Sequence, residues 1–264
     1  YWTMAGGNLV FGSEIKVLFA HPEVPRRFSD QGVFHELMQT KVPGQTAFDG
    51  VHAVEPGCAI VVSRNNGALS IRKHTYWDID YPQEGSRPDR PDQYYVEQVR
   101  AQLLEAVQLR LEADVPVGCY LSGGIDSSAI LGLASAARQS PVKAFTIGFD
   151  DAAYDETSIA RGMADAVGAD QEVLPVDTGH LYEHFERTIW HAETSIYNTF
   201  CIAKVLMSDF VHARDYKVMI TGEGADWSKV WTPQEVLAYV DGARHGADFD
   251  PGQGVNYSDT GYIV

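Results

Sequence analysis

The sequence predicts an α/β protein in which a smaller β-rich part with antiparallel strands precedes a parallel, doubly wound sheet. Two observations carry this prediction. Between residues 93 and 226, short apolar runs alternate with segments of helical periodicity, which is the pattern of βαβ units. Before residue 83, short β-like runs are instead separated by Gly and Pro, and Asn65-Asn66-Gly67 is typical of a hairpin turn.

The first part, residues 1–82, is expected to form few elements. A helix is expected at residues 30–39, and the polar, Pro-rich residues 83–92 are interpreted as a linker. These elements are too few for a complete β-sandwich, so the first part is interpreted as a piece of a larger domain. Strands are expected at residues 8–11, 58–63 and 69–73.

The second part, residues 93–226, opens with a helix. Val96, Val99, Leu103 and Val107 recur at helical spacing within residues 94–112. After residue 226 the chain is rich in Gly and Asp, and residues 227–264 receive no fold assignment beyond one expected helix at 233–243. In the second part, strands are expected at residues 117–121, 142–147, 172–176 and 217–221, and helices at residues 127–138, 156–167, 178–191 and 198–213.

Composition narrows the classes of partner. The chain has 264 residues, a net charge of −16 and a pI of about 4.8. This acidity argues against nucleic acid or anionic membrane as a partner, because both require basic patches. The chain has no apolar run of the roughly 18 residues that a spanning helix needs. Its three cysteines contain no C-x-x-C pair. We therefore expect a cytoplasmic protein and leave a homodimer open.

The strongest motif is Ser122-Gly123-Gly124-Ile125-Asp126-Ser127-Ser128, which follows an apolar strand and opens a helix. The glycines let the backbone approach a ligand closely, and free N–H groups at a helix N-terminus attract phosphate. The serine hydroxyls are further candidates for contacts with phosphate oxygens. The carboxylate of Asp126 suits Mg²⁺, which prefers oxygen ligands. The motif therefore predicts a site for a magnesium–nucleotide complex.

A second Gly-bearing loop, Thr221-Gly222-Glu223-Gly224-Ala225-Asp226, also follows an apolar strand. If both strands are parallel in one sheet, the two loops lie at the same edge and face one pocket. Asp226 would then add a second metal ligand, and Glu223 a carboxylate that handles protons. Main chain beside Ile147, at the end of a third strand, could contact the base. Taken alone, the second loop would also fit a solvated turn.

The motifs together resemble the glutamine-hydrolysing asparagine synthetases, which are class II amidotransferases. The glycine-rich loop lacks the Lys of a Walker A motif and is similar to this family's SGGxDS pyrophosphate loop. The similar stretches in the second part are DVPVGCYLSGGIDSS, KAFTIGFDDAAYDE, YNTFCIAK and YKVMITGEGAD. In the first part, GGNLVFGSEIKVLFAHP, PGCAIVV and TYWDIDYP resemble the end of the family's glutaminase domain, of the N-terminal nucleophile type.

This resemblance implies an ATP-dependent ligase with a pyrophosphate-loop ATP-binding fold. Aspartate, ATP and ammonia from glutamine would give asparagine, AMP and pyrophosphate through a β-aspartyl adenylate. It implies that Asp126 and Asp226 hold Mg²⁺ and that Glu223 assists the attack of ammonia. The positions that match nucleotide-binding residues are Leu121, Ser122, Gly123, Gly124, Asp126, Ser127, Ile147, Thr221 and Gly222.

The chain departs from the family at both ends. It begins at Tyr1 and carries no N-terminal Cys nucleophile, so we expect that it is a fragment that does not hydrolyse glutamine by itself. After Asp226, Trp227-Ser228-Lys229 stands where the family continues with a Glu and an aromatic-Gly-Gly stretch. The substrate contacts that the family makes further along have no visible counterpart here.

Other functions stay open. The same loop occurs in β-lactam synthetases, GMP synthetases and tRNA sulfurtransferases, and a non-catalytic nucleotide-binding fragment is a further alternative. His180 and His184 have the i, i+4 spacing of a zinc pair, but the interpretation preferred is a surface helix. Cys119 is interpreted as a core thiol, and Asn198 and Thr199 are weak candidates for contacting the carboxylate substrate.

Overall fold

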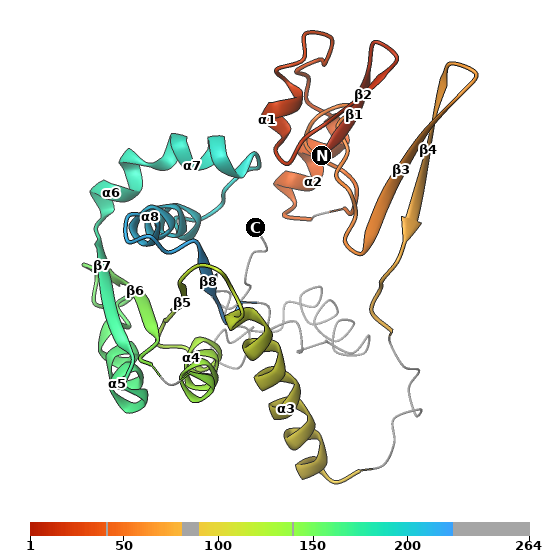
Figure 1. Ribbon diagram of the computed structural model, residues 1–264. Helices are drawn as coiled ribbons and strands as arrows, with labels where there is room; N and C mark the ends of the chain where they lie inside the picture. The colour runs from red at the N-terminus through yellow and green to blue at the C-terminus, as the bar shows by residue number, and fades with distance from the viewer. Residues whose placement is uncertain (41, 81–89, 139, 224–264) are drawn as a thin grey trace, which may run out of the picture. The chain divides into compact units, whose positions relative to one another are not determined.

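A computed structural model describes residues 1–40, 42–80, 90–138 and 140–223 (Figure 1). The expected helix at residues 233–243 and the predicted metal ligand Asp226 lie outside these ranges, as does most of the expected linker.

The chain divides into two compact units. The first comprises Tyr1–Asp89 and His184–Cys201, and the second comprises Arg90–Glu183 and the chain from Ile202 onward. Residues 184–201 therefore group with the N-terminal part of the chain, which the sequence pattern does not predict.

The first unit begins with an antiparallel pair of strands, β1 (Trp2–Ala5) and β2 (Asn8–Phe11). Gly6 and Gly7 connect them with φ angles of 56° and 72°, which L residues with side chains rarely adopt. β2 matches the expected strand, whereas β1 and the short helix α1 (Ile15–Leu18) were not expected from the sequence.

The predicted hairpin is confirmed. β3 (Cys58–Asn65) pairs antiparallel with β4 (Ala68–Thr75), and Asn65 lies opposite Ala68. Asn66 and Gly67 have φ angles of 50° and 86°, as the mirror-image turns that connect hairpin strands require.

The predicted first helix is also present, as α2 (Asp30–Leu37). It begins after Ser29, whose hydroxyl accepts a hydrogen bond from Gly32 N at 3.1 Å, so Ser29 is its N-cap. The small core of this unit buries five apolar residues, Ala5, Ile15, Leu18, Val24 and Val51.

The second unit contains the predicted parallel sheet. Helix α3 (Asp92–Leu111) leads into a sheet with the strand order β7-β6-β5-β8, in which each neighbouring pair is parallel. The strands are β5 (Val117–Tyr120), β6 (Lys143–Phe149), β7 (Asp170–Val176) and β8 (Val218–Ile220). All four overlap the strands expected from the sequence.

Helices cover both faces of this sheet, as a doubly wound fold requires (Figure 1). On one face, α4 (Ile125–Ala137) and α5 (Thr157–Val167) pack with α3 against Cys119, Ala144 and Ile220. On the other face, α8 (Phe200–His212) packs against Phe145 and Met219. Successive strand residues therefore serve opposite cores, as the period of two in a β-strand dictates.

One expected helix is wrong as a continuous element. Residues 178–191 form α6 (Thr178–Glu183) and α7 (Phe185–Ala192), with a break at His184. The two helices belong to different compact units, so tertiary packing overrides a local periodicity that would have continued. The other helices of the second unit match their expected positions within about two residues, the usual uncertainty of helix ends.

Within the described ranges, the helices lack the combination of length and apolar character needed to cross a bilayer.

Candidate active site at the carboxyl ends of β5 and β8

The topology places a ligand crevice beside β5. From β5 the chain runs through α4 to β6 and through α5 to β7, and it then returns past α8 to β8 on the other side of β5. The connections leave to opposite sides at this point, which makes the carboxyl ends of β5 and β8 a topological switch point. β5 and β8 are paired in register, with Val117 opposite Val218 and Cys119 opposite Ile220.

The predicted glycine-rich loop leaves β5 at this switch point. Leu121 is 2% exposed and donates its N–H to Phe145 O at 2.8 Å, so the start of the loop is fixed to β6. The chain then passes Ser122, Gly123 and Gly124 and enters α4 at Ile125. The side chains of Leu121 and Ile147 pack in the two cores on opposite faces of the sheet.

Two serines shape the loop from within. Ser127 Oγ accepts a hydrogen bond from Ser122 N at 3.2 Å and lies 2.9 Å from Ser122 Oγ. Ser122 Oγ also accepts one from Gly124 N at 3.2 Å. Two of the hydroxyls expected to contact phosphate, those of Ser122 and Ser127, are thus bonded to the loop itself, and Ser127 is buried. Their role in this structure is to hold the loop in shape.

The second predicted loop lies directly against the first. A Cβ added at Gly222 would be 2.6 Å from Ser127 N and 2.7 Å from the carbonyl carbon of Asp126, both of them main-chain atoms. A side chain at this position would therefore force the main chain of one loop to shift. The two loops approach each other as expected at Gly222, the position at which the structure shows the second loop against the first.

Glu223 has a partner that the sequence analysis did not assign. Lys204 Nζ, on α8, lies 2.8 Å from Glu223 Oε1, and about half of each side chain is exposed. Glu223 N also donates to Thr221 Oγ1 at 3.4 Å. Lys204 ends the family-like stretch YNTFCIAK but belongs to no motif, and a lysine on a helix is usually a solvated surface residue.

A hollow of about 430 Å³ lies beside β8 and adjoins the second loop. It brings the guanidinium-bearing Arg110 of α3 near Thr221 and Glu223, another proximity that the sequence does not signal. The residues that line it are Arg110, Val218, Met219, Ile220, Thr221 and Glu223.

The donors of this site fit a polyphosphate. Gly123 N already donates to a carboxylate oxygen of Glu156 at 3.0 Å, so the loop binds an anionic oxygen in this structure. Asp126 lies in the first turn of α4 and suits Mg²⁺, which commonly takes one or two carboxylates together with phosphate oxygens. The described residues contain no group of three or more His, Cys, Asp or Glu side chains placed to hold a metal ion.

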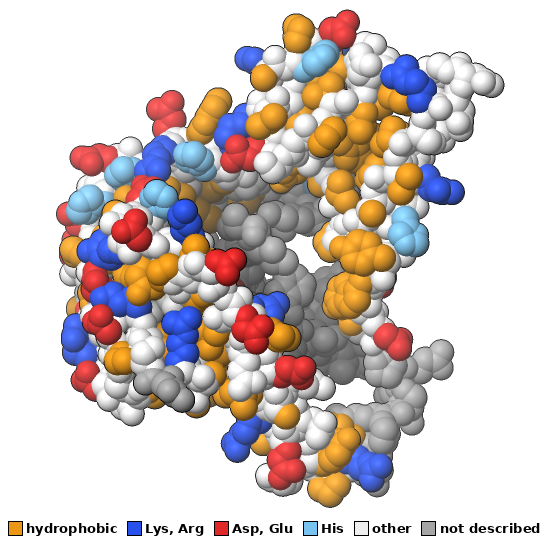
Figure 2. All heavy atoms as spheres, in the orientation of Figure 1, with side chains coloured by type: hydrophobic (Ala, Val, Ile, Leu, Met, Phe, Trp, Pro, Cys, Tyr) orange, Lys and Arg blue, Asp and Glu red, His pale blue; other side chains and the backbone are white. Residues whose placement is uncertain are grey.

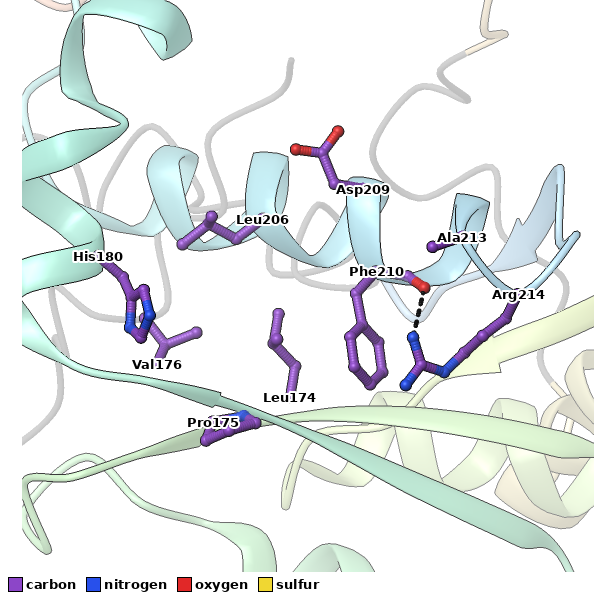
Figure 3. A pocket seen from close by; sticks show the side chains of 9 residues that line it. All are labelled: Leu174, Pro175, Val176, His180, Leu206, Asp209, Phe210, Ala213 and Arg214. Atoms are coloured by element: carbon purple, nitrogen blue, oxygen red, sulfur yellow. Dashed lines mark hydrogen bonds between the residues drawn. The ribbon is translucent and has the colours of Figure 1, made fainter.

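A second hollow, of about 290 Å³, lies at the opposite edge of the sheet, between β7 and α8 (Figure 3). Leu174 and Leu206 point into it, and Arg214 stacks over the ring of Phe210 at 3.4 Å. His180 lies at its rim, where its main-chain N–H donates to Asp177 Oδ1 at 2.9 Å and its Nδ1 accepts a hydrogen bond from Asp177 N at 3.3 Å. None of the predicted nucleotide-binding residues lines it.

Charges on the second unit are mixed. Figure 2 shows Asp and Glu side chains interspersed with Lys and Arg over the visible face. The hydrogen bonds that Glu172 accepts from Lys143 and Arg214 hold the pKa of its carboxyl below the ordinary value.

A parallel α/β sheet with a glycine-rich loop at its switch point defines a class of proteins that bind ligands at the carboxyl ends of their strands. Residues 98–227 match the family model for asparagine synthase, and residues 1–77 match the model for the glutamine amidotransferase domain. The chain belongs to the asparagine synthase family.

The curated relatives of the chain include proteins named amidases and proteins named asparagine synthetases. The chain is 37% identical over 244 residues to amidase chyE of Penicillium rubens and 34% identical over 244 residues to amidase chry2 of Gibberella zeae. Each of these matches covers 86% of this chain and 35% of the relative. This chain is also 27% identical over 229 residues to asparagine synthetase [glutamine-hydrolyzing] 1 of Bacillus subtilis. That match covers 86% of this chain and 34% of the relative. The chain thus spans about a third of the length of these relatives.

Proposed function

We propose that this chain carries the ATP-activating centre of an amide-forming ligase that acts on the side-chain carboxylate of aspartate. The observation that carries the proposal is the close approach of Gly222 to the main chain of Asp126 and Ser127, which brings the second loop against the first. Family membership supports the reaction class, and the Gly123 N–H, which donates to a carboxylate oxygen in this structure, supports a polyphosphate ligand.

In the proposed reaction, an oxygen of the aspartate side chain attacks the α-phosphorus of ATP. The bond from that phosphorus to the bridging oxygen breaks, and pyrophosphate leaves. Ammonia then attacks the carbonyl carbon of the β-aspartyl adenylate, the bond to AMP breaks, and asparagine forms. Loop N–H groups and the N-terminus of α4 would hold the phosphate oxygens. When bound at Asp126, Mg²⁺ would offset the negative charge of the phosphates.

Glu223 is the proposed acceptor of the proton that ammonia loses. Its carboxylate lies at the carboxyl end of β8, where Oε1 is 2.8 Å from Lys204 Nζ. The exposure of both side chains leaves room for Glu223 to exchange this partner for an incoming ammonium group.

A second candidate keeps the ATP chemistry but changes the acceptor. The two relatives named amidases are more similar to this chain than the named asparagine synthetase is, at 37% and 34% against 27% identity. This difference in identity is the reason to test acceptor carboxylates other than that of aspartate. Release of pyrophosphate should be measured with aspartate and with other carboxylic acids, each with ammonium as the nitrogen source. The acid that stimulates release identifies the acceptor.

The metal assignment is tested by Asp126→Ala. We expect the magnesium-dependent binding of ATP to be lost, because the carboxylate proposed to hold the ion is gone. Asp165→Ala, at an exposed position of α5, serves as the matched control and should bind as the wild type does. Unchanged affinity in Asp126→Ala would contradict the assignment. Binding of ATP without formation of AMP would favour the non-catalytic alternative.

A further inference from the structure

Glu156 places a carboxylate on the main chain of the predicted pyrophosphate loop. Its Oε2 accepts the hydrogen bond from Gly123 N at 3.0 Å, and the two residues are 33 positions apart in the chain. The approach is close, because a Cβ added at Gly123 would lie 3.0 Å from Glu156 Cβ. A side chain at position 123 would therefore make Glu156 shift by a few tenths of an ångström.

The side chain of Glu156 is not engaged by its own helix. Glu156 occupies the N-cap position of α5 but makes no side-chain capping hydrogen bond there. Asp155 takes that role instead, since its Oδ1 accepts Thr157 N at 3.2 Å. The side chain of Glu156 therefore bonds the loop and does not cap α5.

Gly123 N differs from its neighbours in the charge of its acceptor. Ser122 N and Gly124 N donate to the neutral hydroxyls of Ser127 and Ser122, whereas Gly123 N donates to a carboxylate. A carboxylate and a phosphate compete for the same kind of donor, because both are anions with oxygen acceptors. A phosphate oxygen can bind Gly123 N in this loop only after Glu156 has moved away.

Resting on the proposed function, we infer that Glu156 is the resident anion of the loop. It occupies Gly123 N until a polyphosphate displaces it, and it opposes polyphosphate binding through its negative charge. Glu156 therefore lowers the affinity for polyphosphate and makes binding depend on Mg²⁺, which offsets the repulsion between the two anions. In this role Glu156 is a positioning residue, not a catalytic one.

The test is calorimetric titration of the full chain with inorganic pyrophosphate, with and without Mg²⁺. Glu156→Gln keeps an oxygen acceptor for Gly123 N but removes the charge. We expect about fivefold tighter binding of magnesium pyrophosphate, the size of an exposed charge–charge interaction, and a larger gain without Mg²⁺. The matched control is Asp155→Asn, which removes a neighbouring charge and keeps a capping oxygen for Thr157. It should change affinity by less than about twofold, because exposed charges are screened by salt.

Hydrogen exchange separates displacement from a merely structural role. In the ligand-free protein, Glu156→Ala should speed exchange of the Gly123 amide, whereas pyrophosphate should restore its protection. Unchanged or weaker pyrophosphate binding in Glu156→Gln, with a wild type that binds, would overturn the inference and leave the proposed function in place. If the wild type and both Glu156 variants failed to bind magnesium pyrophosphate and MgATP, the proposed function would fall together with this inference.

Discussion

The carboxylate of Glu193 fixes residues 184–201 to the rest of the first unit, and its removal should destabilise that unit. Its two oxygens accept hydrogen bonds from Ile15 N at 2.6 Å, Lys16 N at 2.7 Å and Lys16 Nζ at 3.1 Å. The Glu193 side chain is only 9% exposed. One carboxylate from late in the sequence thus satisfies two N–H groups at the start of α1.

The magnitude follows from these contacts. Hydrogen bonds to a charged group contribute roughly 1.5–3 kcal/mol each, and a lost N-cap alone costs about 1 kcal/mol. Water can reach part of the vacated site, so we expect Glu193→Ala to destabilise the first unit by about 3 kcal/mol. Glu193 also has a φ of 54°, a conformation that costs a residue with a side chain about 1 kcal/mol. Glu193→Gly should therefore destabilise less than Glu193→Ala.

The assay is hydrogen exchange at the amides of Ile15 and Lys16, followed with chemical unfolding of the first unit. A loss of about 3 kcal/mol corresponds to roughly a hundredfold faster exchange if these amides exchange by opening of this unit. Glu186→Ala, an exposed position of α7, is the control and should leave both rates unchanged. Exchange within about twofold of the wild type in Glu193→Ala, or a glycine variant less stable than the alanine variant, would refute the reasoning.

The same contact makes stability depend on pH. Burial acts to raise the pKa of the Glu193 carboxyl, but the hydrogen bonds from Lys16 and Ile15 outweigh it, so the folded pKa lies below the ordinary value of 4.5. Because the folded pKa is depressed, the stabilisation is fully present above about pH 4.5 and is lost as the pH falls through the folded pKa. The difference in the free energy of unfolding between the wild type and Glu193→Gln should therefore shrink as the pH falls through the folded pKa of Glu193.

Two further predictions concern the second unit. Gly222→Ala should destabilise the second unit by about 1–3 kcal/mol and weaken ATP binding, because the new Cβ would press on the main chain of Asp126 and Ser127. The control is Gly162→Ala, in open space on α5, which should stabilise the unit by about 1 kcal/mol. Thermal unfolding of the two variants would show the opposite signs. Cys119 is fully buried, and burial raises the pKa of its thiol to about 11. Cys119 should therefore resist alkylation at pH 8, whereas the partly exposed Cys58 and Cys201 should react. Mass spectrometry of the labelled native protein checks this, and rapid labelling of Cys119 would contradict its burial.

The sequence by itself determined the parallel sheet, because alternating apolar runs and helical periodicity are local patterns that βαβ units impose. It also located the hairpin turn at Asn66 and Gly67, where the backbone needs positive φ angles. The glycine-rich loop after β5 was found for the same reason, since its glycines and its place between strand and helix are visible in a few consecutive residues.

Only the tertiary structure decided which distant side chains meet. Glu156 reaches Gly123 across 33 residues, and Lys204 reaches Glu223 across 19. Neither contact is indicated by a periodicity or a local motif in the sequence. The break at His184 was invisible too, because a helical pattern continues through it while the chain passes from one compact unit to the other. Local propensity specifies elements, whereas contacts between elements depend on strand order and helix packing, which no single stretch of the chain encodes.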